Sequence, residues 1–140
     1  MDYRHVLVAT PQFIKSFGKP ESPHDLVKFP CASWSKKDNS AEWILGGEKI
    51  LIKTSIRVND YPHMRYLALQ HKCITELPPF MVRKMIEEKR LVHILPEYDF
   101  PQYCVNLVFQ SRHQLSRIAR VYSNFCTSNA ERYLQSNGQS

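Results

Sequence analysis

The sequence predicts an α/β fold, a mixed sheet with flanking helices, and three observations support it. Short apolar runs typical of strands alternate with segments whose apolar residues recur at helical spacing. A pair of glycines at 46 and 47 indicates a β-hairpin, and therefore an antiparallel insertion in the sheet. A final amphipathic stretch from about residue 116 to 134 predicts a long helix. The 140 residues suffice for one domain with a core of its own, so we expect it over 1–134, followed by a polar tail over 135–140.

The first thirty residues predict one strand and two helices in quick succession. Residues 5–9 form an apolar run of strand type. Thr10 then offers an N-cap oxygen, and Pro11 occupies the first helical position, where its missing N–H has no cost. A glycine at 18 ends this helix, and the segment 22–30 begins with a capping-box-like pattern and ends at a proline.

The middle of the chain predicts a strand followed by a hairpin. Residues 31–35 have the composition of a strand, and 36–40 form a polar loop. A turn at Gly46-Gly47 pairs Trp43 with Ile50, because both central positions of a type I′ turn require positive φ. We expect one face of this hairpin to be apolar and the other charged.

The second half continues the alternation of strands and helices. Asn59 or Asp60 is a suitable cap for a helix that carries Met64, Leu67 and Ala68 at helical spacing. The other elements that we expect here are strands at 55–58, 73–77, 91–95 and 103–109, a helix that begins at Pro78-Pro79 and continues to about residue 90, and the last helix.

The net charge of +6 does not by itself indicate a nucleic-acid-binding surface. Lysines and arginines are scattered singly or in pairs, and only Arg112, Arg117 and Arg120 form a plausible basic patch. A solvated surface is the preferred interpretation of this patch, with an anion or partner contact as the alternative. The chain has no apolar run suited to a membrane span and no secretory leader. We therefore expect a cytoplasmic protein without membrane contact.

The cysteines, histidines and carboxylates show no pattern of a catalytic or metal site. The four cysteines, Cys31, Cys73, Cys104 and Cys126, are far apart in apolar contexts, which favours buried free thiols. The acidic residues are scattered, and the sequence has no nucleophile elbow, zinc motif or phosphate-binding glycine loop. We expect no enzyme activity, no metal and no cofactor.

The best candidate site combines Asn59, Asp60 and Tyr61 with Thr75 and Glu76. In open α/β sheets, ligands bind beyond the carboxyl ends of strands, where helix N-termini present free N–H groups. The first three residues follow a predicted strand and begin a helix, and the other two lie in the next strand. An N-cap and an ordinary turn are the structural alternative for Asn59 and Asp60.

Several ordered segments carry a resemblance to a known family. These are residues 7–14 with the Gly18-Lys-Pro20 stop, residues 56–60 with the Val-Asn-Asp turn, and Ile74-Thr-Glu-Leu-Pro78. In this order they resemble the second half of the effector-binding domain of LysR-type transcriptional regulators. One departure lies at residues 70–73, Gln-His-Lys-Cys, where that family usually has a glycine-bearing turn.

The resemblance implies a type 2 periplasmic-binding-protein fold and a function. A complete second lobe would span about 9–95, and about 103–134 would return into a first lobe whose opening strands are absent, as is the DNA-binding domain. It also implies a small-molecule effector, such as an organic acid or another metabolite, a homodimer, and DNA contact only through the missing domain. The implied effector-lining residues are Ala9, Thr10, Asn59, Asp60, Tyr61, Ile74 and Thr75.

A second hypothesis stays open beside this one. The chain could be a stand-alone α/β module that works by protein association, without ligand or DNA binding. An incomplete first lobe would leave an open sheet edge and an uncovered apolar helix face, which favour pairing with another chain.

Overall fold

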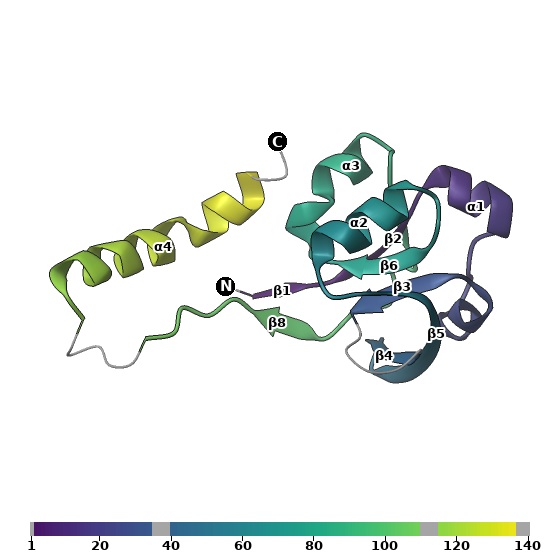
Figure 1. Cartoon of the computed structure of the whole chain (residues 1–140), viewed down its shortest axis with the longest axis horizontal. Helices are drawn as coiled ribbons and strands as arrows, with labels where there is room; N and C mark the ends of the chain where they lie inside the picture. Colours follow the sequence, from purple (N-terminus) through teal and green to yellow (C-terminus); the bar gives the residue numbers. More distant parts are fainter. Residues whose placement is uncertain (1, 35–39, 110–114, 137–140) are drawn as a thin grey trace.

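The computed structural model describes residues 2–34, 40–109 and 115–136 of the chain. Figure 1 shows a body of strands and helices from which the last helix, α4, lies apart. The elements in chain order are β1 (Asp2–Arg4), β2 (Val6–Ala9), α1 (Pro11–Phe17), the 3₁₀ helix η1 (Pro23–Lys28), β3 (Cys31–Trp34), β4 (Ser40–Leu45), β5 (Glu48–Val58), α2 (Tyr61–Leu69), β6 (Ile74–Leu77), the 3₁₀ helix η2 (Pro79–Met81), α3 (Arg83–Glu87), β7 (Val92–Ile94), β8 (Gln102–Cys104) and α4 (Arg117–Ser136).

Six strands form the main sheet, in the order β4-β5-β3-β6-β2-β7. The central strand β3 runs parallel to β5 and to β6, whereas β2 runs antiparallel to β6 and β7. The strands β1 and β8 form a separate antiparallel ribbon between the body and α4 (Figure 1). The predicted α/β class with a mixed sheet and flanking helices is therefore confirmed.

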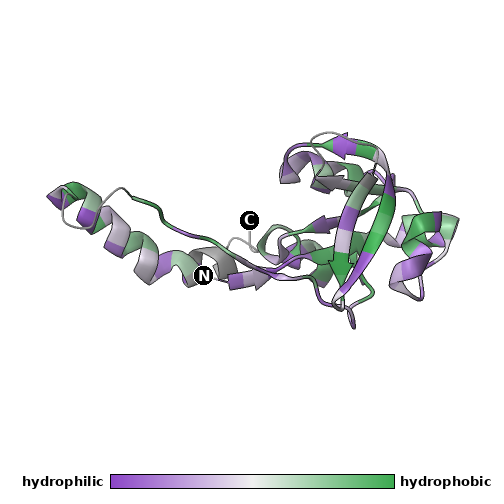
Figure 2. Cartoon of the chain, turned by 90° about the horizontal axis from the view of Figure 1, so that it is seen from below, coloured by the Kyte–Doolittle hydropathy of each residue, from purple (hydrophilic) through white to green (hydrophobic). Residues whose placement is uncertain are grey.

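The two faces of the sheet bury separate apolar clusters, and Figure 2 shows that hydrophobic residues concentrate along its strands. One cluster packs under α1, η1 and the hairpin, and its buried members are Leu7, Ala9, Phe13, Leu26, Cys31, Trp43, Leu45, Ile50, Ile52, Ile74, Ile94, Leu95 and Phe100. The other packs under α2 and the segment around α3, and its buried members are Val8, Met64, Ala68, Leu77, Val82 and Leu91. Since apolar burial is the main favourable term in folding, these clusters hold the strand ends in fixed positions.

Local signals account for the first helical elements. The Thr10 hydroxyl accepts the backbone N–H of Phe13 at 3.2 Å, and Gly18, at φ +87°, ends α1 with its N–H donated to Ile14. Both predictions are confirmed. The second predicted helix forms as a 3₁₀ turn, in which the Asp25 carboxylate accepts the backbone N–H and the hydroxyl of Ser22.

The hairpin register is confirmed, because Trp43 pairs with Ile50. The prediction of a separate strand at 55–58 is wrong. Strand β5 runs without a break from Glu48 to Val58. Its hydrogen-bonded partner strand changes along its length, because it pairs with β4 up to Lys53 and with β3 from Thr54 onwards. This change of partner needs no turn, so nothing local in the sequence marks it.

The turn glycines differ in what surrounds them, which gives a test. A Cβ on Gly46 would lie 3.0 Å from the Tyr98 ring, whereas a Cβ on Gly47 would meet nothing within 4 Å; both have positive φ. We expect Gly46→Ala to lower the free energy of unfolding by about 2–3 kcal/mol, and Gly47→Ala by about 1 kcal/mol, because only the first adds overpacking to backbone strain. Urea denaturation measures both, and equal losses would contradict the role of the Tyr98 contact.

The later elements depart from prediction in length. The helix expected from Pro78-Pro79 to about residue 90 splits into η2 and α3, because Val82 has a non-helical φ of −130°. The strand expected at 103–109 is only Gln102–Cys104, paired with β1, and residues 105–109 have no regular structure. The long helix is confirmed as Arg117–Ser136, which includes two residues of the expected tail, while 137–140 lie outside the described residues.

Candidate functional site

One edge of the sheet collects the carboxyl ends of three parallel strands. Strands β3, β5 and β6 end there at Trp34, Val58 and Leu77. Strand β2 begins at the same edge, because it runs antiparallel and pairs Val6 with Leu77. We call this the carboxyl edge; it is the place where open α/β sheets bind ligands.

A buried carboxyl group lies at the carboxyl edge. Glu76 is only 6% exposed, and its Oε1 accepts the Ser33 hydroxyl at 2.8 Å and the Trp34 backbone N–H at 3.4 Å. The Ser33 oxygen in turn accepts the indole N–H of Trp43 at 3.1 Å. Among the described residues, Glu76 Oε2 has no hydrogen-bond partner. Burial raises the pKa of this carboxyl from 4.5 to about 7, although the hydrogen bonds act in the opposite direction.

A buried histidine immediately precedes β2 at the same edge. His5 is 7% exposed, and neither of its ring nitrogens has a hydrogen-bond partner among the described residues. Burial lowers its pKa from 6.5 to about 4, so the imidazole is neutral at pH 7. Aromatic rings surround it: Tyr103 stacks on it with ring centroids 4.6 Å apart, and Tyr61 meets it edge-on at 5.4 Å.

His5 and the two tyrosines belong to a larger group of rings that we call the aromatic cluster. Its members are Tyr3, His5, Trp34, Tyr61, Phe80, Phe100 and Tyr103. They come from both strands of the β1–β8 ribbon, from the segments next to β2 and β8, from the end of β3, from the first residue of α2 and from η2. Burial raises the pKa of Tyr61 to about 12, and the charge of Glu76 contributes to the increase in both Tyr61 and Tyr103. The rings and the carboxyl therefore form one site.

The structure separates the predicted site residues into two groups. Asn59, Asp60 and Tyr61 follow β5 at the carboxyl edge. Ala9 and Ile74 lie at the opposite edge. Ala9, the last residue of β2, pairs with Val92, the first residue of β7. Ile74, the first residue of β6, pairs with Cys31, the first residue of β3. At 3.3 Å per residue, three steps of β6 place the two edges roughly 10 Å apart.

Thr10 and Thr75 have other surroundings. The Thr10 hydroxyl, beyond the end of β2, lies 2.7 Å from the His71 Nδ1, so it joins α1 to the turn after α2. Thr75 lies within β6, fully buried, and its hydroxyl has no hydrogen-bond partner among the described residues. Asp60 follows the end of β5 at the carboxyl edge, whereas Thr10 lies at the opposite edge and Thr75 lies inside its strand.

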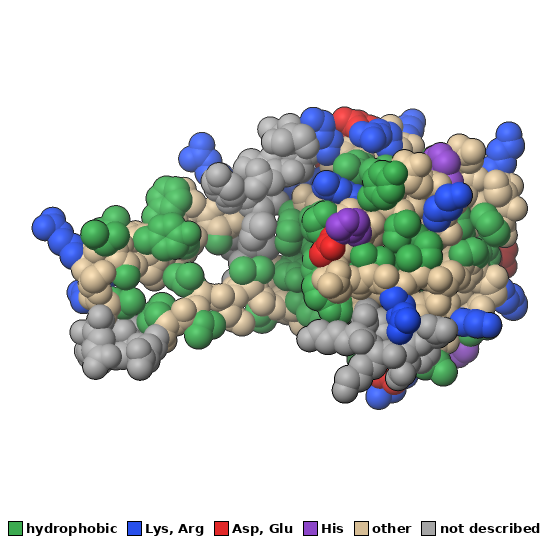
Figure 3. Space-filling model, viewed as in Figure 1, with side chains coloured by type: hydrophobic (Ala, Val, Ile, Leu, Met, Phe, Trp, Pro, Cys, Tyr) green, Lys and Arg blue, Asp and Glu red, His purple; other side chains and the backbone are tan. Residues whose placement is uncertain are grey.

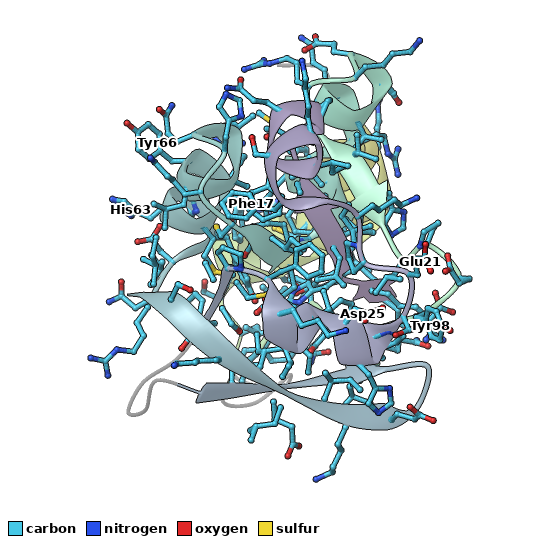
Figure 4. All side chains as sticks on the ribbon, turned by 90° about the vertical axis from the view of Figure 1, so that its right-hand side faces the viewer. Phe17, Glu21, Asp25, His63, Tyr66 and Tyr98 are labelled. Carbon is cyan, nitrogen blue, oxygen red and sulfur yellow. The ribbon has the colours of Figure 1, made fainter. Side chains whose placement is uncertain are left out.

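Asp60 caps α2, as predicted. Its carboxylate accepts the backbone N–H of His63 at 2.8 Å and also contacts the His63 ring. The backbone hydrogen bond is the main reason that the pKa of Asp60 is lowered. Figure 4 shows His63 and Tyr66 pointing outward from α2, away from the sheet.

The cap gives a second testable prediction. We expect Asp60→Ala to lower the free energy of unfolding by about 1 kcal/mol, because the His63 N–H loses its acceptor. Asp60→Asn keeps a side-chain oxygen at this position and is the control, with stability close to that of the wild type. Equal losses in urea denaturation would show that the charge of Asp60, rather than the cap, provides the stabilisation.

The sequence predictions did not include Ser33 or the members of the aromatic cluster other than Tyr61, which are Tyr3, His5, Trp34, Phe80, Phe100 and Tyr103. The one available signal was a polar side chain inside an apolar strand run, which both Ser33 and Glu76 show. A buried polar side chain usually has a structural or functional reason to be there.

Thiols and possible metal ligands lie elsewhere. Cys31 and Cys73 are buried free thiols as predicted, and burial raises the pKa of each to about 12. The prediction of burial is wrong for Cys104, which is exposed, and for Cys126, which is half-buried, because the β1–β8 ribbon and α4 lie off the apolar clusters. Within 2–34, 40–109 and 115–136 no group of three His, Cys, Asp or Glu residues could hold a metal ion.

Two surface expectations concern the last helix and membranes. Arg117 and Arg120 are exposed in the first turn of α4, while Arg112 lies outside the described residues. No helix in the described part of the chain is both long and apolar enough to cross a membrane.

Solved structures with this arrangement are regulatory domains of LysR-type transcriptional regulators. The chain superposes on the regulatory domain of CrgA from Neisseria meningitidis with a TM-score of 0.76 at 22% identity, covering 92% of this chain and 65% of that one. For full-length AphB from Vibrio cholerae the TM-score is 0.79 at 18% identity, with coverages of 91% and 45%. The fold is thus the periplasmic-binding-protein-like fold of those regulatory domains.

The chain belongs to the LysR substrate binding domain family, whose sequence pattern matches residues 1–131. It is 31% identical over 104 residues to the probable HTH-type transcriptional regulator LtrA of Klebsiella pneumoniae, covering 71% of this chain and 34% of that protein. It is 27% identical over 130 residues to an HTH-type transcriptional repressor of Pseudomonas aeruginosa, with coverages of 89% and 41%. The resemblance found in the sequence is confirmed, and the chain spans less than half the length of these relatives.

Proposed function

We propose that this chain is the ligand-sensing part of a LysR-type transcriptional regulator and binds a small molecule at the carboxyl edge. The observation that carries the proposal is the buried Glu76 carboxyl with an unpartnered oxygen beside the aromatic cluster, in a member of this family. Buried polar atoms without partners are rare in folded proteins, and a bound ligand is one way to satisfy them. Asn59, Asp60 and Tyr61 contribute to the same edge, whereas Ala9, Thr10 and Ile74 do not contact this ligand.

A division of the chain into parts of two lobes would place the binding site between them. Residues from about 9 to 95 make the second lobe, and the β1–β8 ribbon connects it to the part of a first lobe that about 103–134 supply. The ribbon brings Tyr3 and Tyr103 against the carboxyl edge, so the ligand would lie close to the connection. Ligand binding there changes the lobe arrangement, and a DNA-binding domain elsewhere in the regulator responds to it. A regulator of transcription works on DNA, so we place the protein in the cytoplasm.

Backbone amide NMR of the 140-residue chain, titrated with mixtures of organic acids, amino acids and aromatic metabolites, tests the proposal. We expect one class of compound to shift the amides of residues 33–34, 58–61 and 76–78, at the carboxyl edge. Shifts confined to the opposite edge, around residues 9–10 and 74, would contradict the location of the site. Operator-specific DNA binding by this chain alone would contradict the assignment of DNA contact to another domain.

A second candidate function, protein association, has its own observation. Helix α4 exposes Ile118, Val121, Tyr122 and Phe125, with exposed fractions from 57% to 83%. The preceding segment also exposes Val105, Leu107 and Val108, and Figure 3 shows hydrophobic side chains along this whole arm. Contiguous exposed apolar surface of this kind indicates an interface.

We propose that the remainder of a first lobe covers this surface in a complete regulatory domain. The solved CrgA regulatory domain supports the proposal, since this chain covers only 65% of it. In the chain by itself a second copy is the available cover, which is consistent with the homodimer expected from the family resemblance.

A further inference from the structure

The charge at the carboxyl edge limits which ligands it can hold. Two carboxyl groups lie there, Glu76 within the sheet and Asp60 at the start of α2, and so does the cation Arg57, the backbone of which pairs with Ser33 near the end of β5. The N-terminus of a helix usually attracts anions, but the Asp60 carboxylate already accepts the N–H group of His63 that an anion would use. His5, the buried base of the site, is neutral at pH 7 because burial lowers its pKa to about 4. An anionic group placed at Glu76 would therefore gain nothing from the uncharged imidazole, and it would be repelled by the Glu76 carboxylate, which is partly ionised at pH 7 because its pKa is about 7.

We propose that the ligand of the carboxyl edge carries a positively charged nitrogen that donates a hydrogen bond to Glu76 Oε2, and an aromatic or flat body that lies against the aromatic cluster. The inference rests on the proposed function, because it names the chemical class of the ligand of that same site. It differs from the organic acid that the family resemblance suggested.

The hydrogen-bonding pattern of Glu76 matches a donor ligand. Its Oε1 is occupied by Ser33 and Trp34, which fixes the orientation of the carboxyl plane. The remaining oxygen, Oε2, has no hydrogen-bond partner among the described residues and accepts hydrogen bonds only when the group is ionised or when its proton is on the other oxygen. A cationic N–H donor pairs with both the lone pairs and the charge of this atom, and charge-assisted hydrogen bonds are the stronger kind.

The rings suit the same ligand. The faces of Tyr and Trp rings attract cations, by about 0.5–2 kcal/mol each, and they also stack on flat groups. Tyr61 and Tyr103 are close enough to Glu76 for its charge to raise their pKa values. A ligand nitrogen next to the carboxyl is thus next to these rings as well.

Access requires a side chain to turn. The Oε2 atom is shielded from solvent in this structure, so a ligand reaches it only when a neighbouring side chain moves aside. Trp34 and Tyr103 are the exposed members of the aromatic cluster, at 41% and 39%, and their rotation costs the least packing. The turn of such a ring would be part of the response to the ligand.

Three probes with the same phenylethyl body test the charge preference: 2-phenylethylamine, 3-phenylpropionate and 2-phenylethanol, titrated into the 140-residue chain and followed by amide NMR. We expect the amine to bind at least tenfold more tightly than the acid or the alcohol. Its affinity should increase between pH 6 and 8, because the pKa of Glu76 is about 7 and the ligand needs the carboxylate. An alkylammonium group, with a pKa near that of lysine at about 10, stays charged over this range.

Variants identify the carboxyl. Glu76→Gln should weaken amine binding at least tenfold and remove its pH dependence, whereas Glu42→Gln, an exposed carboxyl paired with Lys49 on the hairpin, should change neither. If Glu76→Gln does not fold, the affinities of the wild-type chain for the amine and for the acid still test the charge preference.

Two outcomes overturn the inference in different ways. Equal or tighter binding of 3-phenylpropionate at residues 33–34, 58–61 and 76–78 rules out the cationic ligand and leaves the proposed function in place. If no probe shifts these amides and the metabolite mixtures also leave them unchanged, the ligand site at the carboxyl edge and the proposed function fail together.

Discussion

At pH 8 the Glu76→Gln variant is expected to be more stable than the wild type, by on the order of 3 kcal/mol. The pKa of the Glu76 carboxyl is about 7 in the folded chain against an ordinary value of 4.5. The folded state therefore keeps a proton that the unfolded state releases, and the wild type loses stability as the pH rises from 4.5 to 7. At about 1.4 kcal/mol per pH unit the loss over that interval is roughly 3 kcal/mol. Glutamine is neutral at every pH and keeps an acceptor for Ser33, so it avoids the loss.

His5 has the opposite pH dependence over nearly the same range. Its pKa is about 4 in the folded chain against an ordinary 6.5, so the unfolded state binds the extra proton and stability rises with pH between 4 and 6.5. In the wild type the two dependences offset each other from pH 4.5 to 6.5. Substituting one residue leaves the pH dependence of the other uncompensated. The free energy of unfolding should increase with pH in Glu76→Gln and decrease with pH in His5→Phe.

Urea denaturation of the three proteins at pH 4.5, 5.5, 6.5 and 8 measures these slopes. Phenylalanine keeps a ring to stack on Tyr103, which limits the loss of packing in His5→Phe. Glu42→Gln is the control for surface carboxylates, and we expect its pH profile to follow that of the wild type. A Glu76→Gln profile parallel to the wild type would mean that the carboxyl titrates normally, which is inconsistent with its burial.

Local signals in the sequence predicted those elements whose cause is local. Helix α1 follows from an N-cap threonine, a proline and a terminal glycine within nine residues, and all three act as expected. The hairpin register follows from the two glycines of its turn. The family resemblance added the order of the elements and the fold, because it compares the whole chain rather than short windows.

The elements that sequence reasoning missed depend on long-range partners. Nothing near Thr54 shows that β5 continues from one partner strand to another, since the exchange depends on where β3 lies. The run at 103–109 has the composition of a strand, but only Gln102–Cys104 finds a partner, in β1, about a hundred residues earlier. Strand composition predicts an extended backbone and leaves its pairing undetermined.

The site shows the same limit. The predicted position of Asn59, Asp60 and Tyr61, after a strand and at the start of a helix, agrees with the structure because both signals are visible locally. Ala9 and Ile74 were grouped with them, but β2 runs antiparallel to its neighbours, which places its last residue at the opposite edge. The side chains that complete the carboxyl edge come from β3 and from the segments beside the β1–β8 ribbon, and only the tertiary structure brings them to Glu76.

The exposed apolar stripe of α4 consists of Ile118, Val121, Tyr122 and Phe125. Two substitutions in this stripe test whether it holds copies of the chain together. We expect the wild-type chain to self-associate, and the double variant Val121→Glu, Phe125→Glu to be monomeric at micromolar concentration. Burial of a Val or Phe side chain contributes about 1.5–3 kcal/mol relative to exposure, so losing two of them weakens association roughly 10²- to 10⁴-fold. Size-exclusion chromatography with light scattering measures the mass of each protein over a dilution series.

Thr127→Glu is the matched control, because it adds a negative charge to an exposed position of α4 that lies on the face roughly opposite Val121 and Phe125 at 100° per residue. Its association should equal that of the wild type. The double variant should keep the wild-type urea transition of the main sheet, since both side chains are more than half exposed and lie outside the two apolar clusters. If the double variant associates as strongly as Thr127→Glu, the contact between copies involves another surface. The remainder of a first lobe, in a complete regulatory domain, would then be the proposed cover of the stripe.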